Sequence, residues 1–117
     1  MNIKSGNTDN RNLLEIIPVK NIDWEIQPDS GLVHLKQPKF KSALLRKYLL
    51  PLLPDPYFRI KLDEVGTFVW LEIDGKKTTR MIAQATEKKF GERVNPVHDR
   101  LGKFIRSLKQ SRLIEYQ

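Results

Sequence analysis

Cysteine is absent from this chain of 117 residues, and its absence excludes several classes of site. Without a thiol the chain forms no disulfide framework, no thiolate metal centre, no iron–sulfur cluster and no cysteine nucleophile. Because disulfides belong to oxidising compartments, we expect a cytoplasmic protein. The first 20 residues mix charged side chains with asparagine and hold no continuous apolar stretch, so we expect no secretory signal either.

Long hydrophobic runs are also missing. The most apolar stretch, residues 43–54, is interrupted by Arg46, Lys47 and Pro51. A transmembrane helix needs about 20 consecutive apolar residues, so the sequence predicts no membrane span. Hydrophobic residues still make up 39% of the chain, which at this length supports one modest core and therefore one domain.

Acidic side chains are scarce compared with basic ones. The chain has 14 Asp and Glu against 21 Lys and Arg, which gives a formal net charge of +7. Residues 41–117 hold this whole excess, because residues 1–40 carry equal numbers of both signs. Nucleic acid, an anionic membrane surface and an acidic peptide all match such a charge, and the charge by itself selects none of them.

The first third of the chain predicts an arm followed by a β-hairpin. Residues 1–20 are rich in asparagine and poor in apolar side chains, so we expect a flexible arm and place the folded domain at 21–117. Two short alternating runs then flank the turn-forming residues 28–31. We expect these runs to pair, with a buried face made by Trp24, Ile26, Leu35 and either Leu32 or Val33.

Residues 40–53 place apolar side chains at helical spacing, with Lys41, Arg46 and Lys47 on the remaining faces. Pro51 stops or kinks this helix. We expect its apolar stripe to pack on the domain or across a symmetric homodimer, and binding to a membrane surface is the alternative. After it, residues 57–62 alternate apolar with basic side chains, which predicts a strand.

Three helices are predicted next. Asp63 is placed to cap the first, and Gly66 within that helix indicates a close approach of another part of the backbone. Thr78 or Thr79 begins the second, which ends at Gly91. The predicted buried stripe of the first helix consists of Val65, Phe68, Val69 and Ile73.

The third of these helices opens with Asn95 as its cap and Pro96 in the first turn. Projection at 100° per residue turns Lys103 and Arg106 outward, so the helix is basic on its exposed side. Residues 113–116 predict a last short strand. The predicted buried stripe of this helix consists of Val97, Leu101, Phe104, Ile105 and Leu108.

The sequence offers no arrangement of residues suited to catalysis. His34 and His98 are far apart and lack metal-ligand spacing, so we expect neither a metal nor an organic cofactor. Asp63 and Glu64 are adjacent, and neighbouring helix positions point in different directions, so they do not form an acid–base pair. We therefore expect a binding protein and no enzyme.

Two kinds of binding fit this order of elements. In the first, the strand at 57–62 is an edge strand that accepts an extended peptide while the basic third helix contacts its side chains. In the second, the domain is a winged-helix nucleic-acid-binding protein whose basic helix enters the major groove. Neither the charge nor the periodicity decides between a peptide and a nucleic acid.

One run of residues resembles a known family. It is IKLDEVGTFVWLEIDGKKT at 60–78, followed by Ile82-Ala83, the triplet KFG at 89–91 and a closing helix that ends near Leu113. The resemblance is to the PqqD family, small peptide-binding proteins of pyrroloquinoline quinone biosynthesis and related pathways, and it covers about residues 24–116. In the second helix the chain has Ala85 and Thr86 where the family usually has large aliphatic residues.

The resemblance implies an α+β fold in which an N-terminal β-hairpin and a third strand pack on a winged-helix-like body of three helices. It implies a peptide chaperone that recognises the leader of a ribosomally made precursor peptide and presents it to a modifying enzyme, often a radical S-adenosylmethionine enzyme. The family's cleft lies between the third strand and the third helix. It maps onto the peptide-binding residues Tyr57, Phe58, Arg59, Ile60, Lys61, Leu62, Arg100, Leu101, Lys103 and Phe104.

Overall fold

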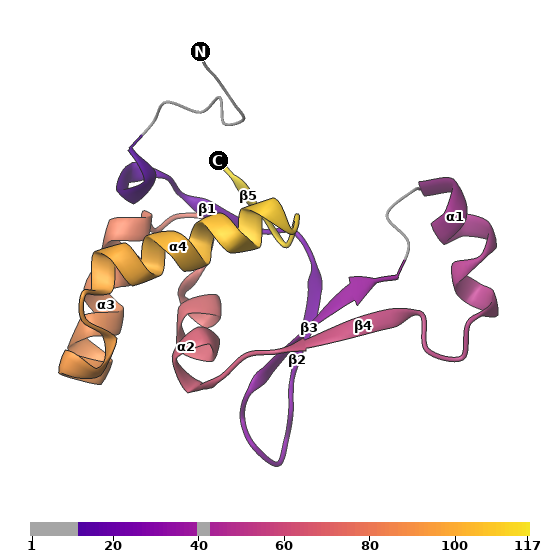
Figure 1. Ribbon diagram of the computed structural model, residues 1–117, viewed down its shortest axis with the longest axis horizontal. Coiled ribbons are helices and arrows are strands. Elements are labelled where there is room, and N and C mark those ends of the chain that lie inside the picture. The colour runs from indigo at the N-terminus through magenta and orange to yellow at the C-terminus, as the bar shows by residue number, and fades with distance from the viewer. Residues whose placement is uncertain (1–11, 40–42) are drawn as a thin grey trace.

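The computed structural model describes residues 12–39 and 43–117, and these form the mixed α+β fold that was expected (Figure 1). Two small antiparallel sheets are present among the described residues: β1 pairs with β5, and β2, β3 and β4 follow one another in the second sheet. The strands are β1 (Pro18–Lys20), β2 (Asp23–Ile26), β3 (Val33–Pro38), β4 (Tyr57–Lys61) and β5 (Ile114–Tyr116). The α-helices are α1 (Ala43–Tyr48), α2 (Glu64–Glu72), α3 (Thr79–Phe90) and α4 (Val97–Gln110), and the 3-10 turns are η1 (Leu13–Glu15), η2 (Leu50–Leu52) and η3 (Gly91–Val94).

The predicted hairpin is confirmed as β2 and β3, which pair Trp24 with Leu35 and Ile26 with Val33. Val33 and Leu35 are fully buried, as the alternation indicated. Ile26 is an exception, because it lies beside the hairpin turn, beyond the reach of the helices, and remains 48% exposed. Only the part of the hairpin that the helices cover therefore contributes to the core.

The core lies between the second sheet and helices α2, α3 and α4. The predicted stripe of α4 is confirmed, with four of its members buried and Phe104 half-buried. In α2 the large buried residue is Trp70, which the predicted stripe did not include, and its ring meets Trp24 edge-on at 6.4 Å. Val65 and Phe68 of that stripe are only half-buried.

The caps at the helix ends follow local chemistry. The Asp63 carboxylate accepts a hydrogen bond from the Gly66 amide at 2.7 Å, and Thr78 Oγ1 accepts one from the Met81 amide at 3.1 Å. Gly91 ends α3 with a φ of 65°, a conformation that glycine adopts without a steric penalty. The expected Asn95 cap is wrong, because Pro96 occupies the N-cap position of α4 and no side chain caps that end.

The segment before β2 differs from the flexible arm that its composition suggested. Residues 1–11 of that arm lie outside the described residues, but residues 12–20 pack on the domain. Ile16 is 2% exposed, and its carbonyl accepts hydrogen bonds from the Thr79 amide at 2.8 Å and from Thr79 Oγ1 at 3.1 Å. The fold therefore begins before residue 21, closed by the pairing of β1 with the C-terminal β5.

The helix predicted at 40–53 is present from residue 43 as α1 and η2, with Pro51 inside η2, whereas residues 40–42 lie outside the described residues. The expected packing of its apolar stripe on the domain is wrong, and the alternative of a symmetric homodimer stays a prediction. Leu44, Tyr48 and Leu52 are 65%, 59% and 76% exposed. Figure 1 shows α1 at the far end of β3 and β4 from the other helices, and none of the described side chains of α1 belongs to the core.

We expect Ile16→Ala to lower the free energy of unfolding by about 2–4 kcal/mol, because it removes a buried side chain and leaves a cavity. The matched change Ile26→Ala should cost less than about 1 kcal/mol, because that side chain is already half in water. Urea unfolding of both variants measures the difference. Equal effects would mean that the segment before β2 is not part of the core.

Candidate functional site

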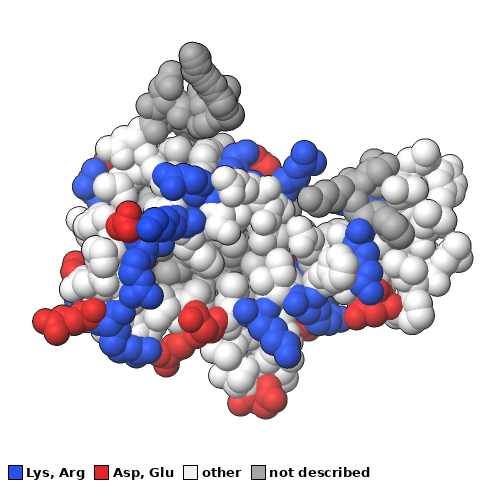
Figure 2. All heavy atoms as spheres, viewed as in Figure 1, with Lys and Arg blue, Asp and Glu red and all other residues white. Residues whose placement is uncertain are grey.

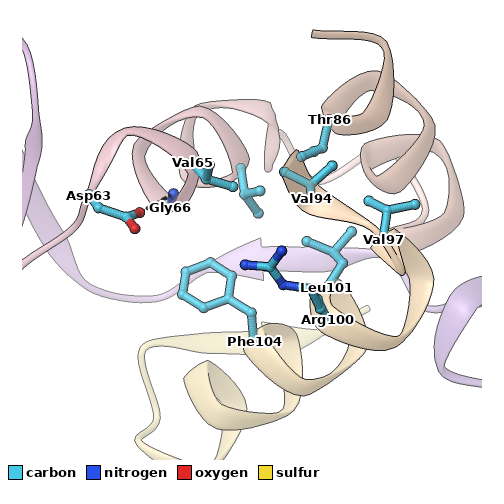
Figure 3. A pocket seen from close by; sticks show the side chains of 10 residues that line it. Asp63, Val65, Gly66, Thr86, Val94, Val97, Arg100, Leu101 and Phe104 are labelled. Carbon is cyan, nitrogen blue, oxygen red and sulfur yellow. Dashed lines mark hydrogen bonds between the residues drawn. The ribbon is translucent and has the colours of Figure 1, made fainter. Parts of the chain in front are cut away.

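An apolar pocket of about 270 Å³ opens between α2, η3 and α4 (Figure 3). Val65 and Val69 are four residues apart on α2, and Val97, Leu101 and Phe104 are four and three residues apart on α4. Such spacings place side chains on one face of a helix, so both helices turn apolar faces toward the pocket. The lining residues are Asp63, Val65, Gly66, Val69, Thr86, Val94, Val97, Arg100, Leu101 and Phe104.

The edge of the pocket is held by the start of α2. A Cβ at Gly66 would lie 3.2 Å from Asp63 Oδ1 and 3.4 Å from Leu62 Cβ, so glycine lets the preceding segment approach the helix. The expected approach by the backbone of another part of the chain is wrong, because the nearest atoms belong to the side chains of Leu62 and Asp63. The Asp63 carboxylate, fixed by the Gly66 amide, lies at the pocket edge in a set orientation (Figure 3).

Arg100 brings a positive charge to the pocket. Its Nη1 donates a hydrogen bond to the Arg93 carbonyl at 2.8 Å, which ties α4 to η3. Arg93 in turn lies 3.2 Å from Glu64, but both side chains of this pair are about two-thirds exposed. Exposed pairs contribute little to stability, so these contacts orient the guanidinium groups more than they stabilise the fold.

The backbone of β4 is open on one side. Leu62 N donates to the Val33 carbonyl at 2.9 Å and Lys39 N to the Pro56 carbonyl at 3.1 Å, which fixes the alternation of the ladder. By that alternation the amides and carbonyls of Arg59 and Lys61 point away from β3. No strand among the described residues lies on that side of β4.

The chain leads from β4 directly to the pocket, because Leu62 alone separates the end of β4 from Asp63. Figure 2 shows Lys and Arg side chains spread over α4 and around β4 on the face in view. The site thus combines an unpaired backbone edge, an apolar pocket and a basic surround.

The expected site residues fall into separate groups. Arg100, Leu101 and Phe104 line the pocket, and Arg59 and Lys61 provide the open edge. Ile60 packs against the core and Leu62 is part of it, so their side chains support the site from within.

Three other expected residues lie elsewhere. Tyr57 is at the α1 end of β4, where its amide donates to Asp55 Oδ1 at 3.3 Å. Phe58 is 55% exposed, and Lys39 Nζ lies 5.4 Å from its ring centroid. Lys103 does not line the pocket and lies 3.3 Å from Asp99. The structure therefore does not bring these three side chains to the pocket.

Several pocket residues were not expected. Val65, Val69 and Val97 stood in predicted core stripes, and periodicity does not separate a core residue from a pocket residue. Thr86 could have been noticed in the sequence as a pocket residue, because it stands where the family usually has a large aliphatic residue. Its hydroxyl donates to the Ile82 carbonyl at 2.7 Å and is thereby satisfied inside the domain. Within the described ranges, no group of three or more metal-ligating side chains comes together.

The turn from α2 to α3 contains the Asp74-Gly75-Lys76 part of the sequence motif. Asp74 Oδ1 accepts hydrogen bonds from the amides of Lys77 and Lys76, both at 2.9 Å. These two amides lower the pKa of the Asp74 carboxyl. Beside them, the hydrogen bond from Lys77 to Glu72 at 2.9 Å raises the pKa of the Lys77 amine. This part of the motif serves the fold and does not line the site.

The fold and the site together define a small α+β domain whose open edge strand runs into an apolar pocket, an arrangement suited to holding an extended chain. A family model described as coenzyme PQQ synthesis protein D (PqqD) matches residues 56–114, just over half of the chain, and the chain belongs to this family. Searches of curated proteins and of solved structures found no match. The matched region begins one residue before β4 and contains β4, α2, α3, η3 and α4, hence every element of the site.

Membership of this family identifies the chain as a peptide-binding accessory protein of modified-peptide biosynthesis. The family is one of non-catalytic proteins. Its motif residues in this chain cap helices and shape turns, as Asp63, Gly66 and Asp74 illustrate.

We expect the substitution Asp74→Asn to lower the stability of the domain at neutral pH. Because the folded state lowers the pKa of this carboxyl, its stabilising contribution is present above the unfolded value of about 3.8 and is lost as the pH falls through the lower folded value. Unfolding of both proteins measured from pH 7 to pH 2 should show a difference that shrinks at the acidic end. A difference that stays constant with pH would contradict this assignment.

Proposed function

We propose that this protein captures the leader of a ribosomally made precursor peptide by strand addition to β4 and presents it to a modifying enzyme of the radical S-adenosylmethionine type. The pathway would be that of pyrroloquinoline quinone or of another modified peptide. Family membership supports the peptide as ligand. The protein itself would supply binding and positioning, and the partner enzyme would supply the chemistry.

The observation that carries this proposal is the open backbone edge of β4 beside the pocket. The edge offers amide donors and carbonyl acceptors at Arg59 and Lys61, and an added strand satisfies such groups with its own backbone. The unpaired backbone groups of an exposed edge strand can pair with another chain. Natural proteins usually cover such an edge or protect it with charged residues when it has no binding role. The charges of Arg59 and Lys61 limit which chains can pair with this edge, but they leave its backbone groups accessible.

The pocket would provide the selectivity that backbone pairing lacks. Its volume of about 270 Å³ is below the roughly 300–1,000 Å³ of pockets that hold small molecules and cofactors. It suits one large apolar side chain, projecting from the peptide at the point where the added strand passes Asp63. The ligand we propose is therefore an extended peptide with an apolar anchor.

Charge would favour acidic residues flanking that anchor. Lys61 and Arg100 bring positive charge to the edge and the pocket, and Arg59 adds another, paired with Glu25 at 2.9 Å. Asp63 and Glu64 lie at the same end of the site and repel acidic side chains. The preference for acidic peptides should therefore be moderate. Contacts between exposed charges contribute about 0.2–1 kcal/mol each, which is less than several backbone hydrogen bonds together.

The alternative of a nucleic-acid-binding domain has less support. It needs several cations of α4 directed at phosphates. Lys103 instead contacts Asp99 at 3.3 Å, Lys109 contacts Glu115 at 3.2 Å, and Arg100 bonds a backbone carbonyl. The experiment below therefore treats duplex DNA as a competing ligand.

We expect Lys61→Pro to weaken peptide binding by about tenfold or more, because proline deletes one open-edge amide and its ring obstructs the added strand. The probe is a peptide selected with the wild-type protein from a displayed library of random sequences. Its affinity for each variant is measured by calorimetry, and circular dichroism confirms the fold. Proline is tolerated on edge strands when its position faces away from the neighbouring strand.

The matched control is Lys61→Ala, which removes the charge but keeps the backbone amide. It should change peptide affinity less than about fivefold. Arg59→Pro and Arg59→Ala form a second such pair. The proposal is wrong if selection yields no binding peptide, if proline and alanine act equally, or if duplex DNA binds with a steep salt dependence while peptides do not.

A further inference from the structure

Helix α1 is oriented opposite to an ordinary surface helix. Its charged Arg46 and the following Leu50 line a hollow of about 560 Å³ together with Lys20, Lys36 and Tyr57 of the domain. The side turned away from the domain is apolar. We call this surface the apolar tip; it consists of Leu44, Leu45, Tyr48, Leu49 and Leu52 of α1, η2 and the residue between them, with Phe58 of β4, and these side chains are 39–76% exposed.

The tip is broad and is flanked by cations. At 100° per residue its five helical side chains cover about 140° of the helix surface, and Arg46 and Lys47 fall at similar angles on either side of that arc. Lys47 Nζ lies 5.5 Å from the Tyr48 ring centroid, and Lys39 Nζ lies 5.4 Å from that of Phe58. Such a helix places its apolar face in the interface of a membrane and its Lys and Arg at the headgroups.

The charge around the tip is mostly positive, and Asp55, which lies between Leu52 and Phe58, is its acidic exception. No acidic residue occurs between Asp29 and Asp55, and the sequence between them contains five Lys and Arg. A symmetric pairing of two tips would bring together five basic side chains from each copy, with Asp55 as the acidic side chain closest in sequence. An anionic surface complements this segment, whereas a second copy of it does not.

The position of the tip suits contact with a flat surface. Figure 1 shows α1 at the end of the β3 and β4 extension, away from α2, α3 and α4. Figure 2 shows that the surface over α1 is largely uncharged on the face in view. None of the helices in the part of the chain that the structure describes is long and apolar enough to cross a membrane. Contact with lipid at the tip would thus be peripheral.

From these observations we propose that the apolar tip binds the surface of a membrane containing anionic lipids. Leu44, Tyr48 and Leu52 enter the boundary between headgroups and acyl chains, and Lys39 and Lys47 meet the headgroups. The open edge at Arg59 and Lys61 and the pocket on α4 take no part in this contact. Membrane binding and peptide binding are therefore independent properties.

The test is flotation of the full chain with vesicles of phosphatidylcholine, alone or mixed equally with phosphatidylglycerol. We expect binding to the anionic vesicles and at least tenfold weaker binding to the neutral ones. The double variant Leu44→Asp with Leu52→Asp should lose more than about tenfold in affinity, since two large apolar side chains no longer enter the membrane.

The matched control is Leu71→Asp with Met81→Asp. These side chains are 42% and 49% exposed on the body of the domain, and the control makes the same change in net charge. It should keep binding within about threefold of the wild type, which is less than the effect of one cation. The variant Lys39→Gln with Lys47→Gln should weaken binding by roughly fivefold per charge removed. Circular dichroism confirms that each variant is folded.

Three results would overturn the proposal. The first is that the wild type does not float with anionic vesicles, and the second is that the control loses as much binding as the tip variant. Sedimentation velocity supplies the third: a dimer that the tip variant abolishes, without vesicle binding by the wild type, would assign the tip to a second copy. Unchanged affinity of the tip variant for the selected peptide separates this test from that of the proposed function.

Discussion

The pairing of β4 with β3 is the interaction on which the rest of the structure depends. In an antiparallel ladder the side chains and the hydrogen-bonding groups both alternate with a period of two. The observed register turns Ile60 toward the helices beside Leu35 and leaves the backbone of Arg59 and Lys61 open. A slip of one residue would turn Arg59 toward the core, so the burial of Ile60 and Leu62 also fixes which amides remain open.

The same short stretch of chain joins this edge to the pocket. Leu62 enters the core and Asp63 caps α2, and the absent side chain of Gly66 leaves room for both of their side chains. The residues that carry the family resemblance therefore determine where the edge ends and where α2 begins. They bring an open strand and an apolar pocket together without themselves specifying a ligand. Under the proposed function, ligand choice would rest with Arg100, Leu101, Phe104 and the valines around them, which line the pocket.

Local chemistry in the sequence predicted much of the fold. The hairpin, β4, the three helices and the caps at Asp63 and Thr78 each depend on neighbouring residues and could be predicted from them. The pairing of β1 with β5 could not, because strands of three residues have no periodicity and their partners lie at opposite ends of the chain. The exposure of the apolar tip could not be predicted either, because periodicity indicates that a helix has an apolar face but not what covers that face. In the site, the resemblance pointed to α4 and β4, whereas Val65 and Val69 were indistinguishable from core residues.

Hydrogen exchange at individual amides of β4 tests the central claim most directly. The amides of Phe58 and Ile60 already face β3, so a bound peptide should leave their exchange almost unchanged. The amides of Arg59 and Lys61 face the open edge, and saturation with a selected peptide should slow their exchange strongly. If the peptide binds and these two amides exchange as fast as before, strand addition to β4 is not how this protein holds its ligand.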